Sequence, residues 1–212
     1  FEGFIQFPLN HYNQLNKKAM SYIQRIEIIE FKFDVVDIGL EQAAAGVGNM
    51  AYKKGNSMTA RRFAFRLLTE DGFSGEYVTH WVGTPSTLGQ IYMIAPLLIG
   101  RDPENRELIY DDLKRELRAY DHMAHGPLDI ALWDLRGIIF EEPLWRLLGG
   151  VKERIPAYSG GIDLLLPVEY LLVKTRGVLE NGFTAVKMKV GRKNLIEDIE
   201  RVDAVRQLIG PD

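Results

Sequence analysis

The chain has 212 residues, a formal net charge of -3 and no cysteine, and 46% of its residues are hydrophobic. This mildly acidic balance gives no indication of a nucleic-acid or membrane-surface partner, and without cysteine no disulfide or thiolate metal site can form. No stretch is apolar for long enough to span a bilayer, and residues 1–20 lack the order of a secretory signal. We therefore expect a cytoplasmic protein with a substantial core and an N-terminal arm over residues 1–20.

The first third of the chain has the pattern of a β-sheet. Residues 21–33 alternate and are rich in β-branched side chains, which predicts a strand, although the core-facing side is ambiguous. Residues 62–69 and 73–81 flank the Asp71-Gly72 pair, which is typical of a hairpin turn. We predict a three-stranded antiparallel meander, in which residues 37–59, rich in Gly, Ala and Asn, form a long loop.

Helical patterns follow. Residues 87–99 and 103–120 predict two helices, the second with Pro103 at its first position. A third helix starts near Leu128, where apolar residues recur at offsets of 3, 4, 7, 10 and 11. A short helical turn over residues 143–148 ends at Gly149-Gly150. We therefore predict an α+β domain over residues 21–150.

The last part, residues 151–212, alternates in type. The predicted order is strand, helix, strand, helix over residues 155–159, 167–179, 183–190 and 194–209. Asn194 is the expected N-cap of the last helix, with Glu197 as its capping-box partner, and its apolar stripe is Ile196, Ile199, Val202, Val205, Leu208 and Ile209. The β-α-β-α order is typical of parallel sheets and barrels. Two βα units cannot bury both faces of a parallel sheet, so we expect the start of a (β/α) barrel, apparently truncated after its second unit.

Two lysines stand in the apolar stretch TAVKMKVG, residues 184–191. Strand alternation places Lys187 and Lys189 on one face, roughly 6–7 Å apart, and Val186 and Met188 on the other. In a barrel, the lysine face near the carboxyl end of the strand is the interior mouth, where chemistry occurs. Two ammonium groups at so short a distance each disfavour the protonated form of the other. A lysine that is held neutral can act as a general base. The alternative is a pair of solvated lysines on an edge strand.

Two motifs resemble a known family. The segment AHGPLDIALWDLRGIIFEEPLWRLLGG, residues 124–150, and the KMK triplet are similar to the mandelate racemase/muconate lactonizing branch of the enolase superfamily. The resemblance covers residues 21–212. It implies an α+β capping domain followed by a (β/α) TIM-like barrel of the enolase type, and usually a homo-oligomer.

The resemblance also implies a reaction. In that reaction Mg²⁺ binds a substrate carboxylate while a base removes the proton on the neighbouring carbon. By the resemblance, Lys189 is the base, and Lys187 is the neighbour that disfavours the protonated form of Lys189. The metal ligands are expected downstream of residue 212, so none is assigned here. A sugar-acid dehydratase is expected first, then a racemase or epimerase of a carboxylate substrate. A non-catalytic small-molecule binding or assembly protein of the same fold is the alternative from another class.

Further residues are candidates for the substrate site. By the same resemblance, the loops at residues 37–59 and 81–90 close over the substrate. His122 and His125 share a helix face, but lack further metal ligands and are expected to cap or lie on the surface. Four residues are expected to line the mouth: Tyr158, Ser159, His80 and Trp81. For His80 and Trp81, a position at the end of a hairpin is an equally good interpretation.

Overall fold

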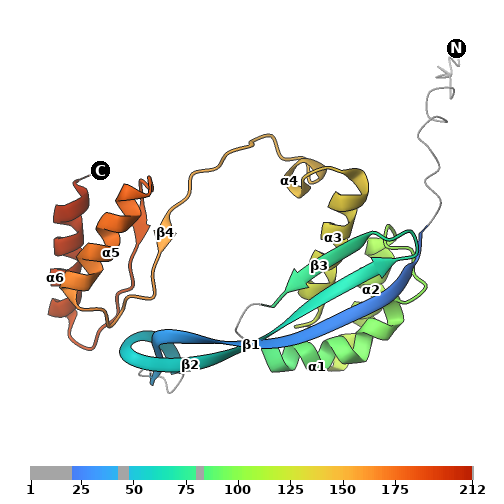
Figure 1. Cartoon of the computed structure of the whole chain (residues 1–212), viewed down its shortest axis with the longest axis horizontal. Helices are drawn as coiled ribbons and strands as arrows, with labels where there is room; N and C mark the ends of the chain where they lie inside the picture. Colours follow the sequence, from blue (N-terminus) through green and yellow to red (C-terminus); the bar gives the residue numbers. More distant parts are fainter. Residues whose placement is uncertain (1–20, 43–47, 80–83, 212) are drawn as a thin grey trace, which may run out of the picture. The chain divides into compact units, whose positions relative to one another are not determined.

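The computed structural model describes residues 21–42, 48–79 and 84–211 (Figure 1). The chain forms two compact units, which divide near Gly149 and Gly150. The first contains the chain up to Phe31 together with Arg62–Gly149, and the second contains Lys32–Arg61 together with Gly150–Asp212. Residues 32–61, which the sequence analysis placed in the first domain, therefore group with the second unit. Among the described residues, no helix is both long and apolar enough to cross a membrane.

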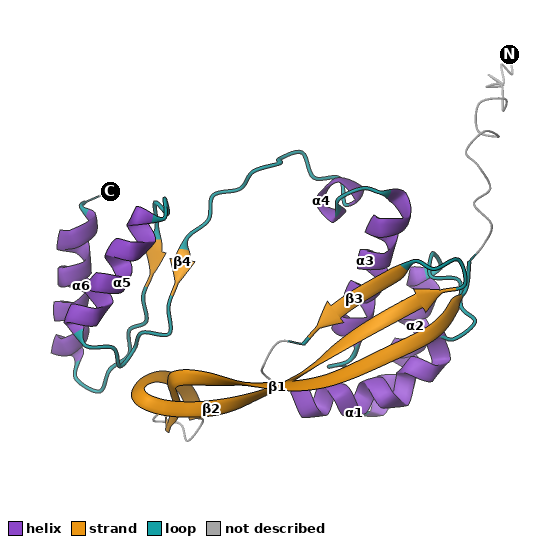
Figure 2. Cartoon of the chain, viewed as in Figure 1, coloured by secondary structure: helices purple, strands orange, loops and turns teal. Residues whose placement is uncertain are grey.

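The strands of the first sheet follow each other in the order β1-β2-β3, which confirms the predicted meander (Figure 2). They span Ile23–Gln42, Gly48–Thr69 and Ser74–Val78. β2 and β3 pair antiparallel around the predicted Asp71-Gly72 turn. The prediction of a loop over residues 37–59 is wrong, because β1 and β2 continue through most of it. β1 and β2 are held here by pairing with each other, which backbone groups make and which leaves little sign in the side-chain pattern.

The core of the first unit lies between the sheet and the helices. Every second residue of β2 is buried there, at Phe63, Phe65 and Leu67, while Ile26 and Ile28 of β1 pack against the same cluster. The side of Ile26 and Ile28 therefore faces the core in this part of β1, while Ile23, on the other side by alternation, is also fully buried. The covering segments are α1 (Thr84–Ile94), a 3₁₀ turn (Ala95–Leu98), α2 (Arg106–Glu116), a second 3₁₀ turn (Leu117–Ala119), α3 (His125–Phe140) and α4 (Leu144–Leu147).

Two expectations about the helices need comment. Pro103 lies in a turn before α2 rather than at its first position, because the helix begins at Arg106. The predicted stripe of α3 is buried at Leu128, Leu132 and Leu135, as expected, whereas Ile138 remains exposed. α3 therefore packs with its first three turns and leaves its last turn at the surface.

The second unit has the predicted order of β4 (Ser159–Gly160), α5 (Val168–Glu180), β5 (Val186–Lys187) and α6 (Leu195–Ile209). β4 and β5 pair in parallel. Both strands are shorter than predicted, and Ile155, the expected start of the first, is 79% exposed. Leu166, Leu171 and Val205 form the core of this unit. Tyr52, from the part of β2 that groups with this unit, packs against that core.

The start of α6 agrees with its predicted cap, but its buried face agrees with the predicted stripe only toward the end of the helix, at Val205 and Ile209. The side chain of Asn194 accepts the N–H of Ile196 at 3.1 Å, which confirms the N-cap. The Glu197 carboxylate bonds to Arg192 rather than completing a capping box. Ile196, Ile199 and Val202 are exposed, and the buried face instead carries Asp198, Arg201 and Val205.

Candidate functional site

The lysine pair lies at the carboxyl end of β5. Lys187 pairs with Gly160 of β4, and a methyl group on Gly160 would come within 3.4 Å of the Lys187 Nζ. The glycine therefore leaves room for the lysine side chain to cross the strand. The Lys187 Nζ lies 5.5 Å from the centre of the Tyr158 ring, a cation–π distance. Lys187, Gly160 and Tyr158 thus share one face of the two-stranded sheet.

The opposite face of this sheet is apolar. Val186 and Met188, which flank Lys187, pack toward the helices against the Leu171 cluster. Ser159 pairs with Val186, and paired residues of a parallel ladder point to the same side of the sheet. Of the two predicted mouth residues of β4, the structure therefore brings Tyr158 to Lys187 and places Ser159 on the other face. Their roles in substrate binding stay predictions.

Lys189 is half-buried and lies beyond the last residue of β5. Its backbone N–H is donated to the Asp163 Oδ1 at 2.7 Å, instead of to a neighbouring strand. The expected strand over residues 183–190 is thus too long at both ends. The position of the proposed base depends on a side-chain hydrogen bond from the loop that follows β4.

A cavity of about 750 Å³ opens in the second unit. Its wall includes Lys187, Ser159 and the loop of Gly161–Asp163, together with one side of α5 and the β1–β2 segment of the same unit. From that segment Asp37 and Tyr52 line the cavity. Asp37 has a positive φ of 56°, and its carboxylate accepts the N–H of Gly55 at 2.8 Å. His80 and Trp81, the other two predicted site residues, lie outside the described residues.

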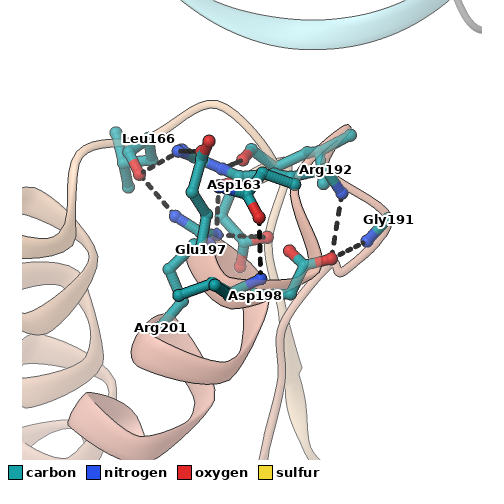
Figure 3. A network of polar contacts seen from close by, with 10 residues as sticks. Asp163, Leu166, Gly191, Arg192, Glu197, Asp198 and Arg201 are labelled. Atoms are coloured by element: carbon teal, nitrogen blue, oxygen red, sulfur yellow. Dashed lines mark hydrogen bonds and ion pairs between the residues drawn. The ribbon is translucent and has the colours of Figure 1, made fainter.

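An arginine that sequence reasoning missed is buried against the loop that follows β4 (Figure 3). Arg201 of α6 is 1% exposed and donates to two backbone carbonyls, those of Leu166 at 2.5 Å and Asp163 at 2.7 Å. Its Nη2 also lies 3.9 Å from the Asp163 Oδ1, the atom that holds the Lys189 N–H. Burial, and then the charge of Arg192, lowers the pKa of Arg201, but a guanidinium stays protonated.

Two further side chains extend this network (Figure 3). Arg192 donates to the Leu164 carbonyl at 2.8 Å and pairs with Glu197 at 2.9 Å. The Asp198 Oδ2 accepts the N–H groups of Gly191 at 2.7 Å and Arg192 at 2.9 Å. The loops after β4 and β5 are therefore joined to the first turns of α6. The signal in the sequence was the helical spacing of three between Asp198 and Arg201, which aligns them with Val205 on one face.

The described ranges, with their gaps at residues 43–47 and 80–83, contain no group of three or more His, Asp or Glu side chains arranged to hold a metal ion. Asp163 and Asp198 are buried, but Asp163 Oδ1 and Asp198 Oδ2 accept backbone N–H groups, which leaves Asp198 Oδ1 as the one buried carboxylate oxygen of the described residues without a hydrogen-bond partner. This set does not fit a Mg²⁺ site, which takes carboxylate and water oxygens in octahedral geometry. We therefore assign Mg²⁺ to no residue of the chain.

Of the two histidines near the start of α3, His122 is exposed as expected, whereas His125 is not. His125 is 8% exposed, not on the surface, and its ring stacks on Tyr110 with 4.0 Å between centroids. Burial, and then the nearby His122, lowers the pKa of His125, while Asp129 opposes this. Its Nε2 has no hydrogen-bond partner among the described residues. A buried neutral imidazole at the start of α3 is the consistent interpretation.

Comparison with known sequences gives a family match and several relatives. The family described as mandelate racemase / muconate lactonizing enzyme, N-terminal domain, matches residues 37–149. The 3,6-anhydro-alpha-L-galactonate cycloisomerase of Streptomyces coelicolor is 44% identical over 118 residues, which are 53% of this chain and 33% of that protein. The L-talarate/galactarate dehydratase of Salmonella typhimurium is 33% identical over 155 residues, 69% of this chain and 39% of that protein.

Solved structures give the same result. A racemase from Streptomyces coelicolor A3(2) with bound magnesium matches with a TM-score of 0.74 and 32% identity, over 89% of this chain and 52% of that one. The L-talarate dehydratase from Polaromonas sp. JS666, complexed with Mg and L-glucarate, matches with a TM-score of 0.75 and 25% identity, over 90% and 52%. The chain thus spans about half the length of these structures, and less of the curated relatives.

Proposed function

The chain belongs to the mandelate racemase / muconate lactonizing enzyme family, and we propose that the complete protein removes the proton from the carbon atom next to the carboxylate of an acid sugar. Lys189 is the proposed base, and Lys187 is the neighbouring cation that disfavours its protonated form. The second unit is then the first part of a (β/α) barrel, with the lysines at its mouth. The observation that carries the proposal is the place of Lys187 and Lys189 at the carboxyl end of β5, with Met188 between them packed on the helices.

The following step in the proposal is elimination. In a dehydratase of a sugar acid, loss of this proton is followed by departure of a hydroxyl group from the next carbon. L-Talarate/galactarate dehydratase among the relatives supports this outcome. The relatives with bound Mg support a Mg²⁺-dependent reaction in the complete protein. Because the described residues do not form such a site, we derive only the roles of the lysines.

A second candidate function rests on the 44% match to an anhydro-sugar cycloisomerase. In an anhydro acid sugar, the leaving oxygen on the next carbon belongs to a ring, so the same proton removal opens that ring. A racemase or epimerase instead returns a proton to the same carbon, and a racemase is among the matching structures. All three begin with the step assigned to Lys189. A homo-oligomeric assembly stays a prediction.

The proposal is tested by exchange of the substrate's α-hydrogen with solvent deuterium. The complete protein is incubated in D₂O with Mg²⁺ and a library of aldonic, aldaric and anhydro acid sugars, and exchange is followed by proton NMR. Lys189→Met is expected to lower the exchange rate by about 10²–10⁴-fold, the usual contribution of a general base. Lys187→Met is expected to have a smaller effect. Lys193→Met, which removes an exposed lysine nearby, is the control and is expected to exchange like the wild type.

The product then separates the candidate functions. A keto-deoxy acid formed from an open-chain sugar acid indicates dehydration, and the same class of product from an anhydro acid indicates ring opening. Deuterium incorporation with inversion of the carbon and no other change indicates racemisation or epimerisation. Absence of Lys189-dependent exchange with every acid would sink the enzymatic proposal and favour a non-catalytic homologue.

A further inference from the structure

The loops after β4 and β5 are joined by side chains of α6, and this arrangement bears on the proposed base. Among the described residues, β5 ends at Lys187, and its pairing with β4 covers Val186 and Lys187 but not Lys189. Its N–H bonds instead to the Asp163 Oδ1. Asp163 belongs to the loop after β4, and it is 6% exposed. The position of Lys189 therefore follows the position of Asp163.

Asp163 is in turn held by Arg201. The two Nη atoms of Arg201 reach the carbonyls of Leu166 and Asp163, which fixes both ends of a four-residue segment of the loop. The second Nη atom also faces the Asp163 carboxylate at 3.9 Å. A planar guanidinium can meet two carbonyls and a carboxylate at once, whereas the ammonium of a lysine is a single point of donation. The contact thus depends on the shape of the arginine fork.

We infer that Arg201 is a positioning residue for Lys189, and that it acts by holding the Asp163 loop to which the Lys189 backbone is bonded. The inference rests on the proposed function. Arg201 itself is enclosed by protein and is not assigned a contact with substrate. Its effect is on geometry, because a shift of about 1 Å in a reacting group can lower a rate by about 100-fold. Asp198 holds the loop after β5 through the N–H groups of Gly191 and Arg192, which follow Lys189 closely in the chain.

The test uses the complete protein and two substitutions, Arg201→Met and Arg201→Lys. Arg176→Met is the control, since Arg176 is an exposed arginine of α5. Two experiments are made on each variant. The first gives the kcat and KM of substrate α-hydrogen exchange, and the second gives the rate of hydrogen–deuterium exchange at the Lys189 backbone amide. For Arg201→Met we expect about a 100-fold lower kcat, a KM within about threefold of the wild type, and faster exchange of the Lys189 amide. Arg201→Lys should fall between that variant and the wild type.

The outcomes decide between positioning and a merely structural role. If Arg201 only supports folding, its variants have a lower melting temperature but an unchanged kcat per folded molecule, and the inference is overturned. A lower kcat with unchanged protection of the Lys189 amide also overturns it, because the effect then bypasses Asp163. If Arg201→Met does not fold, Arg201→Lys decides by the same two measurements. If the wild type exchanges no substrate hydrogen, the proposed function fails, and amide protection in the variants still decides whether Arg201 places Lys189.

Discussion

Replacing Gly75 by alanine should destabilise the first unit, because β3 crosses α3 where no side chain fits. A Cβ at Gly75 would lie 2.5 Å from the Leu135 Cβ and 2.6 Å from the Leu135 backbone N, and would also collide with the Ala131 carbonyl. Ordinary carbon contacts are about 3.5–4.0 Å, so the strand must retreat by roughly 1 Å. Two of the three opposing atoms are backbone, so a rotamer change cannot relieve the clash.

The expected cost has two parts. Overpacking of a close-packed contact costs about 1–3 kcal/mol. The same retreat stretches the bond from the Glu76 N–H to the Asp134 Oδ2, now 2.8 Å, and losing such a bond costs about 1 kcal/mol. We therefore expect the free energy of unfolding to fall by about 2–4 kcal/mol. For a chain of this size, that corresponds to a melting temperature lower by roughly 10 °C.

The assay is urea denaturation of the wild type and Gly75→Ala, followed by circular dichroism. Gly89→Ala is the matched control, because Gly89 lies inside α1 and a Cβ there meets no atom within 4 Å. In a helix interior this change should raise the free energy of unfolding by about 0.5–1 kcal/mol. A Gly75→Ala protein within about 0.5 kcal/mol of the wild type would refute the argument from close approach.

Two further predictions concern charge and capping. Because burial lowers the pKa of His125, the unfolded chain binds this proton first as the pH falls. The free energy of unfolding should therefore decrease below about pH 6.5, and His125→Gln should reduce that slope in urea titrations at several pH values; an unchanged slope contradicts the burial argument. Asn194→Ala removes the side chain that accepts the Ile196 N–H, and should cost about 1 kcal/mol in urea denaturation. Lys193→Ala serves as its control, and equal stability of both variants would show that the cap contributes nothing.

Local sequence patterns predicted the elements whose signals are local. The strand over residues 62–69 and the turn at Asp71-Gly72 into β3 were both predicted, and Phe63, Phe65 and Leu67 of that strand are buried. The spacing of apolar residues from Leu128 gave the helix α3. In α3 most of the side chains that make the pattern are buried, and Ile138 in the last turn is the exception.

The pattern failed where pairing or packing partners are distant. The extension of β1 and β2 buries few apolar side chains, Ala51 among them, and Val36 and Leu40 are exposed on it, so a segment rich in Gly and Ala looked like a loop. On α6 the apolar residues Ile196 and Ile199 are exposed, whereas the charged Arg201 is enclosed. Arginine is almost never fully buried without partners. The partners of Arg201 are backbone carbonyls of the loop that follows β4.

The sequence by itself determined the order of elements, the family motifs and the spacing of two between Lys187 and Lys189; the structure ends the strand at Lys187. Tertiary structure alone decided what surrounds them: Gly160 and Tyr158 beside Lys187, and Asp163 at the Lys189 backbone. The physical reason is that alternation along a strand is a local property of the backbone. A hydrogen bond between residues 26 or 38 positions apart exists only after the chain has folded, and it leaves no periodic trace in the sequence.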